Sequence, residues 1–90
     1  MYFVTFAVIN PQANKKYGNF LVEVYATNAQ EAAIKGIYAS GLYEDYLSEW
    51  VNELAAKGLI PSETNLIDQM KEYAMIGVFD DSKTEDLLHY

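Results

Sequence analysis

An apolar run directly after Met1 predicts a strand in the middle of a sheet. From Tyr2 to Ile9 most residues are β-branched or aromatic, and both faces of a two-residue repeat are apolar. One face holds Tyr2, Val4, Phe6 and Val8, and the other holds Phe3, Thr5, Ala7 and Ile9. Two-sided apolarity is typical of a central strand. The run is short, follows no basic segment and leads into the turn residues of 10–12, which favours a strand over a signal peptide.

A second strand is predicted from Phe20 to Ala26. The segment 10–19 before it is rich in Asn, Gly and Pro, so we expect the two strands to form a hairpin with a long tip. One face of the second strand is apolar and consists of Phe20, Val22, Val24 and Ala26, whereas the other consists of Leu21, Glu23 and Tyr25. We expect the first face to be buried. The second is partly exposed and is a candidate sheet edge or partner surface.

The first of three predicted helices starts near Ala29. Thr27 and Asn28 can each cap it, and a Gln or Glu follows each of them three residues later. Ser40-Gly41 is expected to end it. Small residues within it, Ala29, Ala32 and Gly36, would allow a close approach to the sheet.

The second helix is predicted from Leu42 to Lys57, with Gly58 as its left-handed C-cap. At about 100° per residue, one arc of this helix contains Tyr43, Tyr46, Leu47, Trp50, Val51 and Leu54. We therefore expect Trp50 to be a core residue. The third helix is predicted to begin after the cap Ser62 and to end near Tyr73 or Ala74. Its core-facing stripe consists of Leu66, Ile67, Met70 and Tyr73.

A third strand, Met75 to Phe79, is expected to lie beside the first, because Gly77 disfavours a helix and the Val and Phe after it favour a sheet. Residues 82–90 are expected to form a helical turn or two, capped by Ser82 with Glu85, that packs Leu87 and Leu88 against the body. The predicted fold class is α+β, a small antiparallel sheet of about three strands covered by about three helices in the order ββαααβ. We expect residues 1–90 to form a single domain and residues 80–90 to be its loosely packed tail.

Composition and charge narrow the classes of function. A chain of 90 residues fits one domain, and 51% apolar residues exclude a disordered chain. The lack of Cys excludes disulfides, thiolate metal sites and a cysteine nucleophile. Six Lys, no Arg and thirteen Asp or Glu give a net charge of −7, which has the wrong sign for binding phosphates. No run approaches the roughly 20 apolar residues of a membrane helix, so a cytoplasmic protein without membrane contact is expected.

The sequence contains no recognisable catalytic or metal-binding motif. Its one imidazole, His89, lies next to the C-terminus, where a catalytic base would lack a fixed position. The alternating oxygen side chains of 80–86 depart from a calcium-binding loop, because Glu85 stands where that loop requires Gly. We therefore expect a protein that is not an enzyme and has no cofactor and no metal. Paired carboxylates brought together by the fold are the remaining route to catalysis.

An acidic stripe is the first candidate for partner binding. Asp45, Glu49 and Glu53 are spaced at i, i+4 and i+8 on the predicted second helix, and Glu44 lies beside them. Like charges at this spacing destabilise a helix slightly, and a basic partner would relieve that repulsion. The alternative is a face that only keeps the protein soluble.

Two other surface segments bear on binding. Glu23 and Tyr25, on the exposed side of the second strand, complete the set of candidate partner-binding residues. The basic tip Lys15-Lys16-Tyr17 is expected to be solvated, because two lysines make too few phosphate contacts to bind nucleic acid.

Two functional hypotheses follow, from different classes. The first is a small acidic, non-enzymatic protein-binding module, an inhibitor of the kind found among phage and mobile-element accessory proteins, which it resembles in composition only. Such an inhibitor would imitate DNA and block the basic nucleic-acid-binding groove of a host protein in the host cytoplasm. The alternative is a structural or assembly protein that acts as a homodimer or larger homo-oligomer. The expected partner is a protein with a basic surface, with no direct contact to nucleic acid or membrane.

Overall fold

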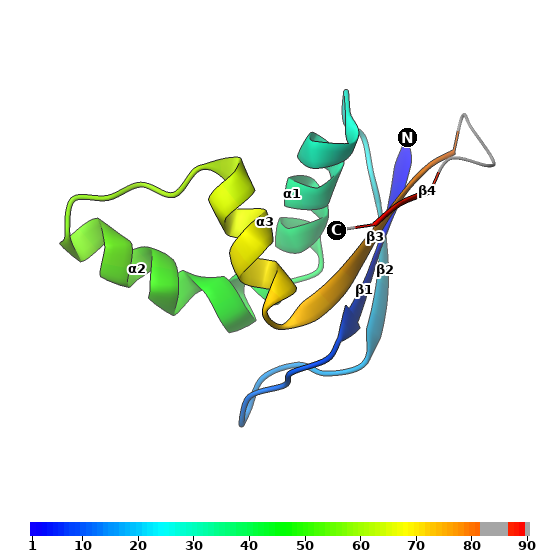
Figure 1. Cartoon of the computed structure of the whole chain (residues 1–90). Helices are drawn as coiled ribbons and strands as arrows, with labels where there is room; N and C mark the ends of the chain where they lie inside the picture. Colours follow the sequence, from blue (N-terminus) through cyan, green and yellow to red (C-terminus); the bar gives the residue numbers. More distant parts are fainter. Residues whose placement is uncertain (82–86, 90) are drawn as a thin grey trace.

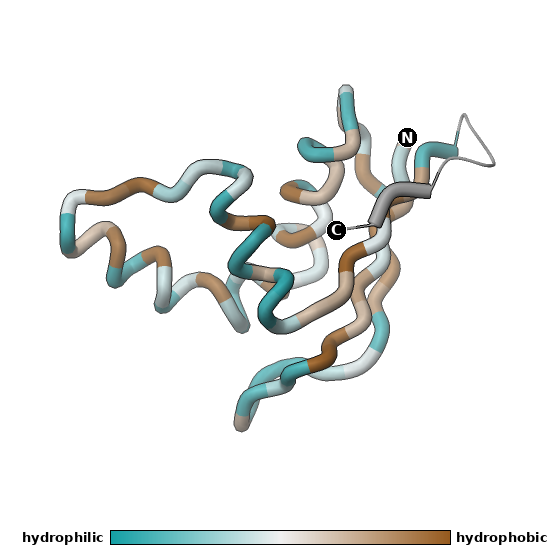
Figure 2. The backbone as a smooth tube through the Cα atoms, viewed as in Figure 1, coloured by the Kyte–Doolittle hydropathy of each residue, from teal (hydrophilic) through white to brown (hydrophobic). Residues whose placement is uncertain are grey.

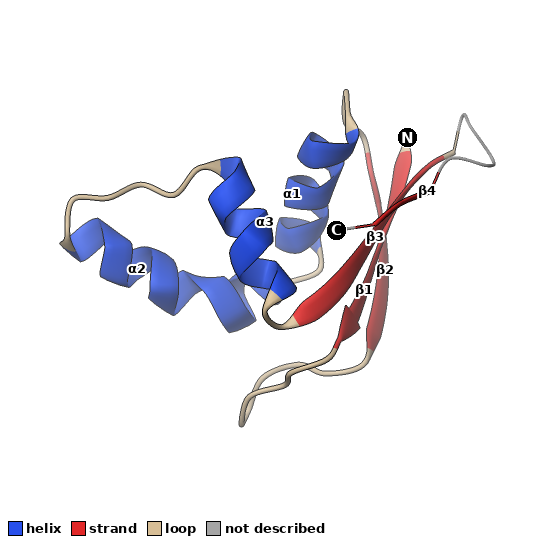
Figure 3. Cartoon of the chain, viewed as in Figure 1, coloured by secondary structure: helices blue, strands red, loops and turns tan. Residues whose placement is uncertain are grey.

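The strands form one antiparallel sheet in the order β2-β1-β3-β4, and the helices lie on one side of it (Figures 1 and 3). This computed structural model describes residues 1–81 and 87–89. Its strands are β1 (Tyr2–Val8), β2 (Asn19–Val24), β3 (Ala74–Asp80) and β4 (Leu87–His89). Its helices are α1 (Ala29–Ala39), the π-helical segment η1 (Tyr43–Leu47), α2 (Ser48–Ala56) and α3 (Glu63–Lys71). The predicted α+β class and the ββαααβ order are confirmed, with β4 as an addition.

β1 is the central strand that its apolar pattern predicts. It pairs with β2 on one side and with β3 on the other, so that Val4 lies between Val22 and Val78. In β1 only Val4 and Phe6 are fully buried, and both lie on the same face of the strand. The largest fully buried side chains are Phe6, Ile37, Leu42, Leu47, Met70, Ile76, Val4 and Val78. The core therefore lies between one face of the sheet and the helices.

α1 lies close against β1, as its small residues predict. A Cβ added at Gly36 would come within 2.8 Å of Val4 Cγ1, which leaves room only for glycine. The helix starts after Asn28, whose side-chain oxygen accepts a hydrogen bond from the Glu31 amide at 2.9 Å. At the start of α3, Ser62 and Asn65 form a reciprocal capping box. Both predicted helix starts are confirmed.

The second predicted helix is wrong in its first turn. Instead of one α-helix, residues Tyr43–Leu47 are π-helical, and the Ser48 amide donates to the Tyr43 carbonyl five residues earlier. α2 follows and projects from the body of the protein (Figure 1). It has no buried residue, and it packs mainly against η1. Trp50 is only partly buried at the rim of the core, so its expected place within the core is also wrong.

The C-terminal segment differs from its prediction. Leu87–His89 form β4 and pair with β3, with His89 opposite Gly77, where a helical turn was expected. The proposed cap at Ser82 and Glu85 lies outside the described residues. Strand pairing prevails here because β3 offers an open hydrogen-bonding edge, whereas a short helical turn has few bonds of its own to stabilise it.

No helix in the described part of the chain combines the length and apolarity needed to cross a bilayer.

The different burial of two neighbouring helical residues yields a stability prediction. Leu47 is completely buried, whereas Trp50 is partly exposed on α2. We expect Leu47→Ala to lower the free energy of unfolding by about 2–5 kcal/mol. Trp50→Ala should lower it by less, despite the larger side chain. Urea denaturation of both variants measures the difference, and an equal or larger loss for Trp50→Ala would contradict the placement of α2 outside the core.

Candidate protein-binding surfaces

α2 and the loop after it form a projecting arm, defined here as residues 48–60. Its acids Glu49 and Glu53 are exposed. The loop at its end is hydrophobic (Figure 2), and Ile60 is 93% exposed there beside the exposed Leu59. An apolar side chain that no part of the described chain covers is suited to insertion into a partner. The arm thus presents carboxylates along its length and apolar side chains at its end.

The predicted acidic stripe is only partly assembled by the structure. The π-turn places one more residue in the turn between Asp45 and Glu49, so the spacing that would align them on an α-helix is interrupted. Asp45 turns toward Lys16, with 3.7 Å between Oδ2 and Nζ. In the described part of the chain, the carboxylates of Glu44, Glu49 and Glu53 form no ion pair or hydrogen bond. Three of the four predicted acids are therefore free for a partner, and Asp45 has a role within the protein.

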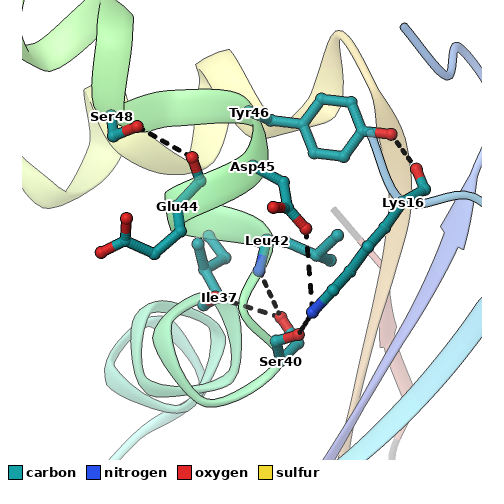
Figure 4. Close-up of polar contacts among 8 residues, drawn as sticks. All are labelled: Lys16, Ile37, Ser40, Leu42, Glu44, Asp45, Tyr46 and Ser48. Carbon is teal, nitrogen blue, oxygen red and sulfur yellow. Dashed lines mark hydrogen bonds and ion pairs between the residues drawn. The ribbon is translucent and has the colours of Figure 1, made fainter. Parts of the chain in front are cut away.

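Lys16 joins the hairpin tip to the start of η1 (Figure 4). Its Nζ donates a hydrogen bond to the Ser40 carbonyl at 2.9 Å, and its own carbonyl accepts one from the Tyr46 hydroxyl. Nζ lies so close to Gly41 that a Cβ there would meet it. Lys16 is exposed, as expected of the tip, but the sequence did not indicate its contacts with Ser40, Asp45 and Tyr46. We call Lys16, Ser40, Gly41, Asp45 and Tyr46 the junction.

Burial controls the electrostatics of the junction. It raises the pKa of the Tyr46 hydroxyl, and the neighbouring Asp45 carboxylate adds to the effect because a second negative charge would be unfavourable there. The pKa of Tyr43 is raised as well, by burial and by the adjacent Tyr38, whose ring stacks on it with 4.5 Å between centroids. Both tyrosines therefore favour their neutral form in the folded protein.

The side of the sheet away from the helices is the second candidate surface, and we call it the open face. It carries Phe3, Thr5, Ala7, Asn19, Leu21, Glu23, Met75, Gly77 and Phe79. Leu21 and Met75 are 64% and 61% exposed, and Thr5 and Ala7 of β1 lie between their two strands, with Thr5 opposite Leu21 and Ala7 opposite Met75. A hollow of about 490 Å³ lies at this place and is lined mostly by apolar groups. Of these residues only Glu23 is charged.

Glu23 and Tyr25 lie on the side of β2 that the sequence assigns to a partner. Both are exposed, and Tyr25 is 73% exposed just beyond the end of the strand. β2 and the arm lie on opposite sides of α1 and α3 (Figure 1). The predicted partner-binding residues therefore fall on two separate surfaces. The contribution of Thr5, Met75 and Gly77 to the open face was missed, although the apolar second face of the first strand could have indicated it.

The described residues contain no group of three or more His, Cys, Asp or Glu side chains that could hold a metal ion. Glu31 and Glu63 line one shallow hollow at the starts of α1 and α3. A hydrogen bond from the Thr27 hydroxyl (2.6 Å) and the nearby Lys35 lower the pKa of Glu31. A general acid at neutral pH needs a raised pKa, so the lowered pKa of Glu31 does not suit that role.

Comparisons with protein-family models, with curated proteins and with solved structures find no match to this chain.

The raised pKa of Tyr46 predicts how stability depends on pH. Because the folded protein holds this proton more tightly than the unfolded chain, the stabilisation is complete below the ordinary tyrosine pKa of about 10 and is lost as the pH rises through the higher folded value. Tyr46→Phe should cost about 1 kcal/mol at neutral pH. The variant should also lose less stability above pH 10 than the wild type does. The loss that remains is due to Tyr43. Urea denaturation at pH 7 and above pH 10 measures both effects.

The control for this measurement is Tyr17→Phe, since the Tyr17 ring is 77% exposed and its hydroxyl takes no part in the junction. This variant should match the wild type at both pH values. A steep alkaline loss that persists unchanged in Tyr46→Phe would contradict the role of the junction.

Proposed function

We propose that this protein is a non-enzymatic protein-binding module whose arm enters a basic groove on a partner protein. The observation that carries the proposal is the projection of α2 from the body with its carboxylates unpaired. A groove that binds the negatively charged phosphates of nucleic acid is itself positively charged, so it is complementary to these carboxylates. The protein would then act as an inhibitor that occupies such a groove, as phage and mobile-element inhibitors of host enzymes do.

The spacing of the acids supports this proposal. Glu49 and Glu53 are separated by about 6 Å along the helix axis, given a rise of 1.5 Å per residue. Phosphates along one strand of DNA advance about 3.4 Å per nucleotide, so the two acids match roughly every second phosphate. Glu44, one turn earlier, extends the acidic surface to the base of the arm. Complementary charge of this kind acts mainly on the rate of association and on specificity.

The apolar end of the arm provides binding affinity that its carboxylates alone do not provide. Carboxylates in a salt solution give little net affinity, because exposed ion pairs are screened. Ile60 and Leu59 can bury apolar surface against the partner, and this contribution does not depend on ionic strength. A partner groove with basic walls and an apolar pocket fits both features.

A pair of charge variants tests the arm. The double variant Glu49→Gln and Glu53→Gln should fold normally and associate more slowly with a partner captured from cell extract at low salt. Its affinity should fall by about fivefold to tenfold at low ionic strength and by less at high ionic strength. The control is Asp68→Asn with Glu72→Gln, at two exposed acids on α3 and at its C-cap, which changes the net charge by the same amount; Asp68 pairs with Lys71 of the same helix at 3.9 Å.

Binding is measured by surface plasmon resonance at two ionic strengths for the wild type and both double variants. The control should behave as the wild type does. Equal losses in the two double variants would show that only net charge matters, and wild-type binding by both would contradict a role for the arm.

A second candidate function is a structural or assembly protein that acts as a homo-oligomer. The observation that favours it is the open face, which exposes Leu21 and Met75 and has Glu23 as the one charged residue among the nine named above. Exposed apolar surface of this kind is typical of contacts between protein chains. Glu23 and Tyr25 belong to this candidate, whereas Glu44, Glu49 and Glu53 belong to the first. Solution mass without any partner distinguishes the two, because only the second requires self-association.

A further inference from the structure

The outer edge of β2 carries backbone groups that have no partner. In an antiparallel pair, residues alternate between those that bond the neighbouring strand and those that point away from it. The Val8 amide donates to the Gly18 carbonyl at 3.0 Å, and the register of β1 and β2 places the following bonded pairs at Phe6 with Phe20 and Val4 with Val22. The amides and carbonyls of Asn19, Leu21 and Glu23 therefore point away from the sheet.

Nothing in the described part of the chain covers these groups. The backbone groups of Asn19, Leu21 and Glu23 have no hydrogen bond beyond the sheet, and all three side chains are exposed. The edge of a sheet is commonly protected by Pro, by charged side chains, especially Lys, or by a bulge. β2 contains no Pro and no Lys, its one charged residue is Glu23, and its pairing with β1 is unbroken over its whole length. Such an edge is shaped to accept another extended strand.

We propose that the occupant of this edge is β2 of a second copy of the chain, paired antiparallel about a two-fold axis with Leu21 opposite Leu21 of the second copy. The proposal specifies the interface of the second candidate function and rests on it. The two sheets would join into one continuous sheet that crosses the dimer. The two open faces would then lie next to each other, with the two Leu21 side chains at the centre.

The register follows from the positions of the free groups. With Leu21 at the two-fold axis, Asn19 of each copy lies opposite Glu23 of the other, and every outward amide and carbonyl of the three residues finds a partner. Moving the axis to residue 20 or 22 leaves part of this set unpaired. Moving the axis toward the C-terminus would also require Tyr25 to pair with the second copy, although its carbonyl already accepts a hydrogen bond from Lys35.

Charge selects the same register. Each copy has a net charge of −7, so a stable pair must keep its acids apart. Glu23 is the only acid of β2, and in this register it lies opposite the neutral amide of Asn19, which can donate a hydrogen bond to it. An axis at residue 23 would instead place two Glu23 carboxylates side by side, which is unfavourable. The arm lies on the far side of α1 and α3 from the sheet (Figure 1).

The exposed tyrosines fit this arrangement. Tyr17 and Tyr25 lie just before and just beyond β2 and are among the most exposed large side chains of the chain. In the proposed register Tyr17 of one copy comes level with Tyr25 of the other at each end of the paired strands. Tyrosine is enriched in contacts between proteins because its ring buries a large area while its hydroxyl stays solvated.

A charge exchange between facing positions tests the pairing. The purified full chain, without any partner, should have twice its monomer mass of 10.2 kDa in sedimentation equilibrium at high protein concentration. Asn19→Glu places two carboxylates opposite each other at both ends of the interface and should weaken dimerisation by up to about tenfold. Adding Glu23→Lys to it creates an opposite-charge pair at the same places and should restore the dimer.

Two further variants separate this edge from the open face. Leu21→Pro removes the outward amide but no bond to β1, so the variant should fold with an unchanged circular dichroism spectrum and be monomeric. Met75→Lys, on the open face away from β2, should leave the dimer intact.

A wild-type monomer, or a double variant no better than Asn19→Glu, would overturn the proposed pairing. So would a dimer that Met75→Lys disrupts, because that result assigns the contact to the open face. None of these outcomes bears on the arm, whose partner binding is measured separately.

Discussion

The arrangement of this protein depends on a strand that is apolar on both faces but is covered on only one. β1 provides Val4 and Phe6 to the core, and α1 approaches so closely that Gly36 has no room for a side chain. Burial of this one face provides the main hydrophobic stabilisation of the sheet. The opposite face and the edge of β2 remain apolar or unpaired, and the arm lies outside the core as well. The surfaces suited to binding are therefore those that the single core leaves uncovered.

The junction connects two of these features. α2 packs mainly against η1, so the direction of the arm is set where η1 begins. There Lys16, from the hairpin tip, bonds to Ser40 and faces Asp45, while Tyr46 bonds back to the tip. These contacts attach the long hairpin to the base of the arm. A tip without them would leave the hairpin mobile. In physical terms, Asp45 contributes to the placement of the acidic surface rather than to its charge.

The sequence predicted the parts that local patterns determine. Alternation in β1 and β2, the caps at Asn28 and Ser62 and the short third strand all follow from the nearest neighbours in the chain. The predicted helix through Trp50 was wrong because helical periodicity cannot show whether the apolar arc meets the core or points past it. The π-turn after Gly41 and the pairing of Lys16 with Asp45 depend on contacts between segments far apart in the chain.

For the candidate surfaces, the sequence correctly assigned the exposed side of β2 and the exposure of Glu44, Glu49 and Glu53. It could not show that these lie on separate surfaces. It also could not show which backbone groups of β2 point outward, because that depends on the register with β1.

Amide hydrogen exchange, followed by NMR at low and at high protein concentration, tests most directly whether the core leaves the β2 edge uncovered and open to a second strand. The amides of Phe20 and Val22, which bond to β1, should be protected at both concentrations. Those of Leu21 and Glu23 should exchange rapidly in dilute solution and become protected as the concentration rises. If Leu21 and Glu23 were as protected as their neighbours in dilute solution, or unprotected at every concentration, the account of an open edge that pairs with a second copy would be contradicted.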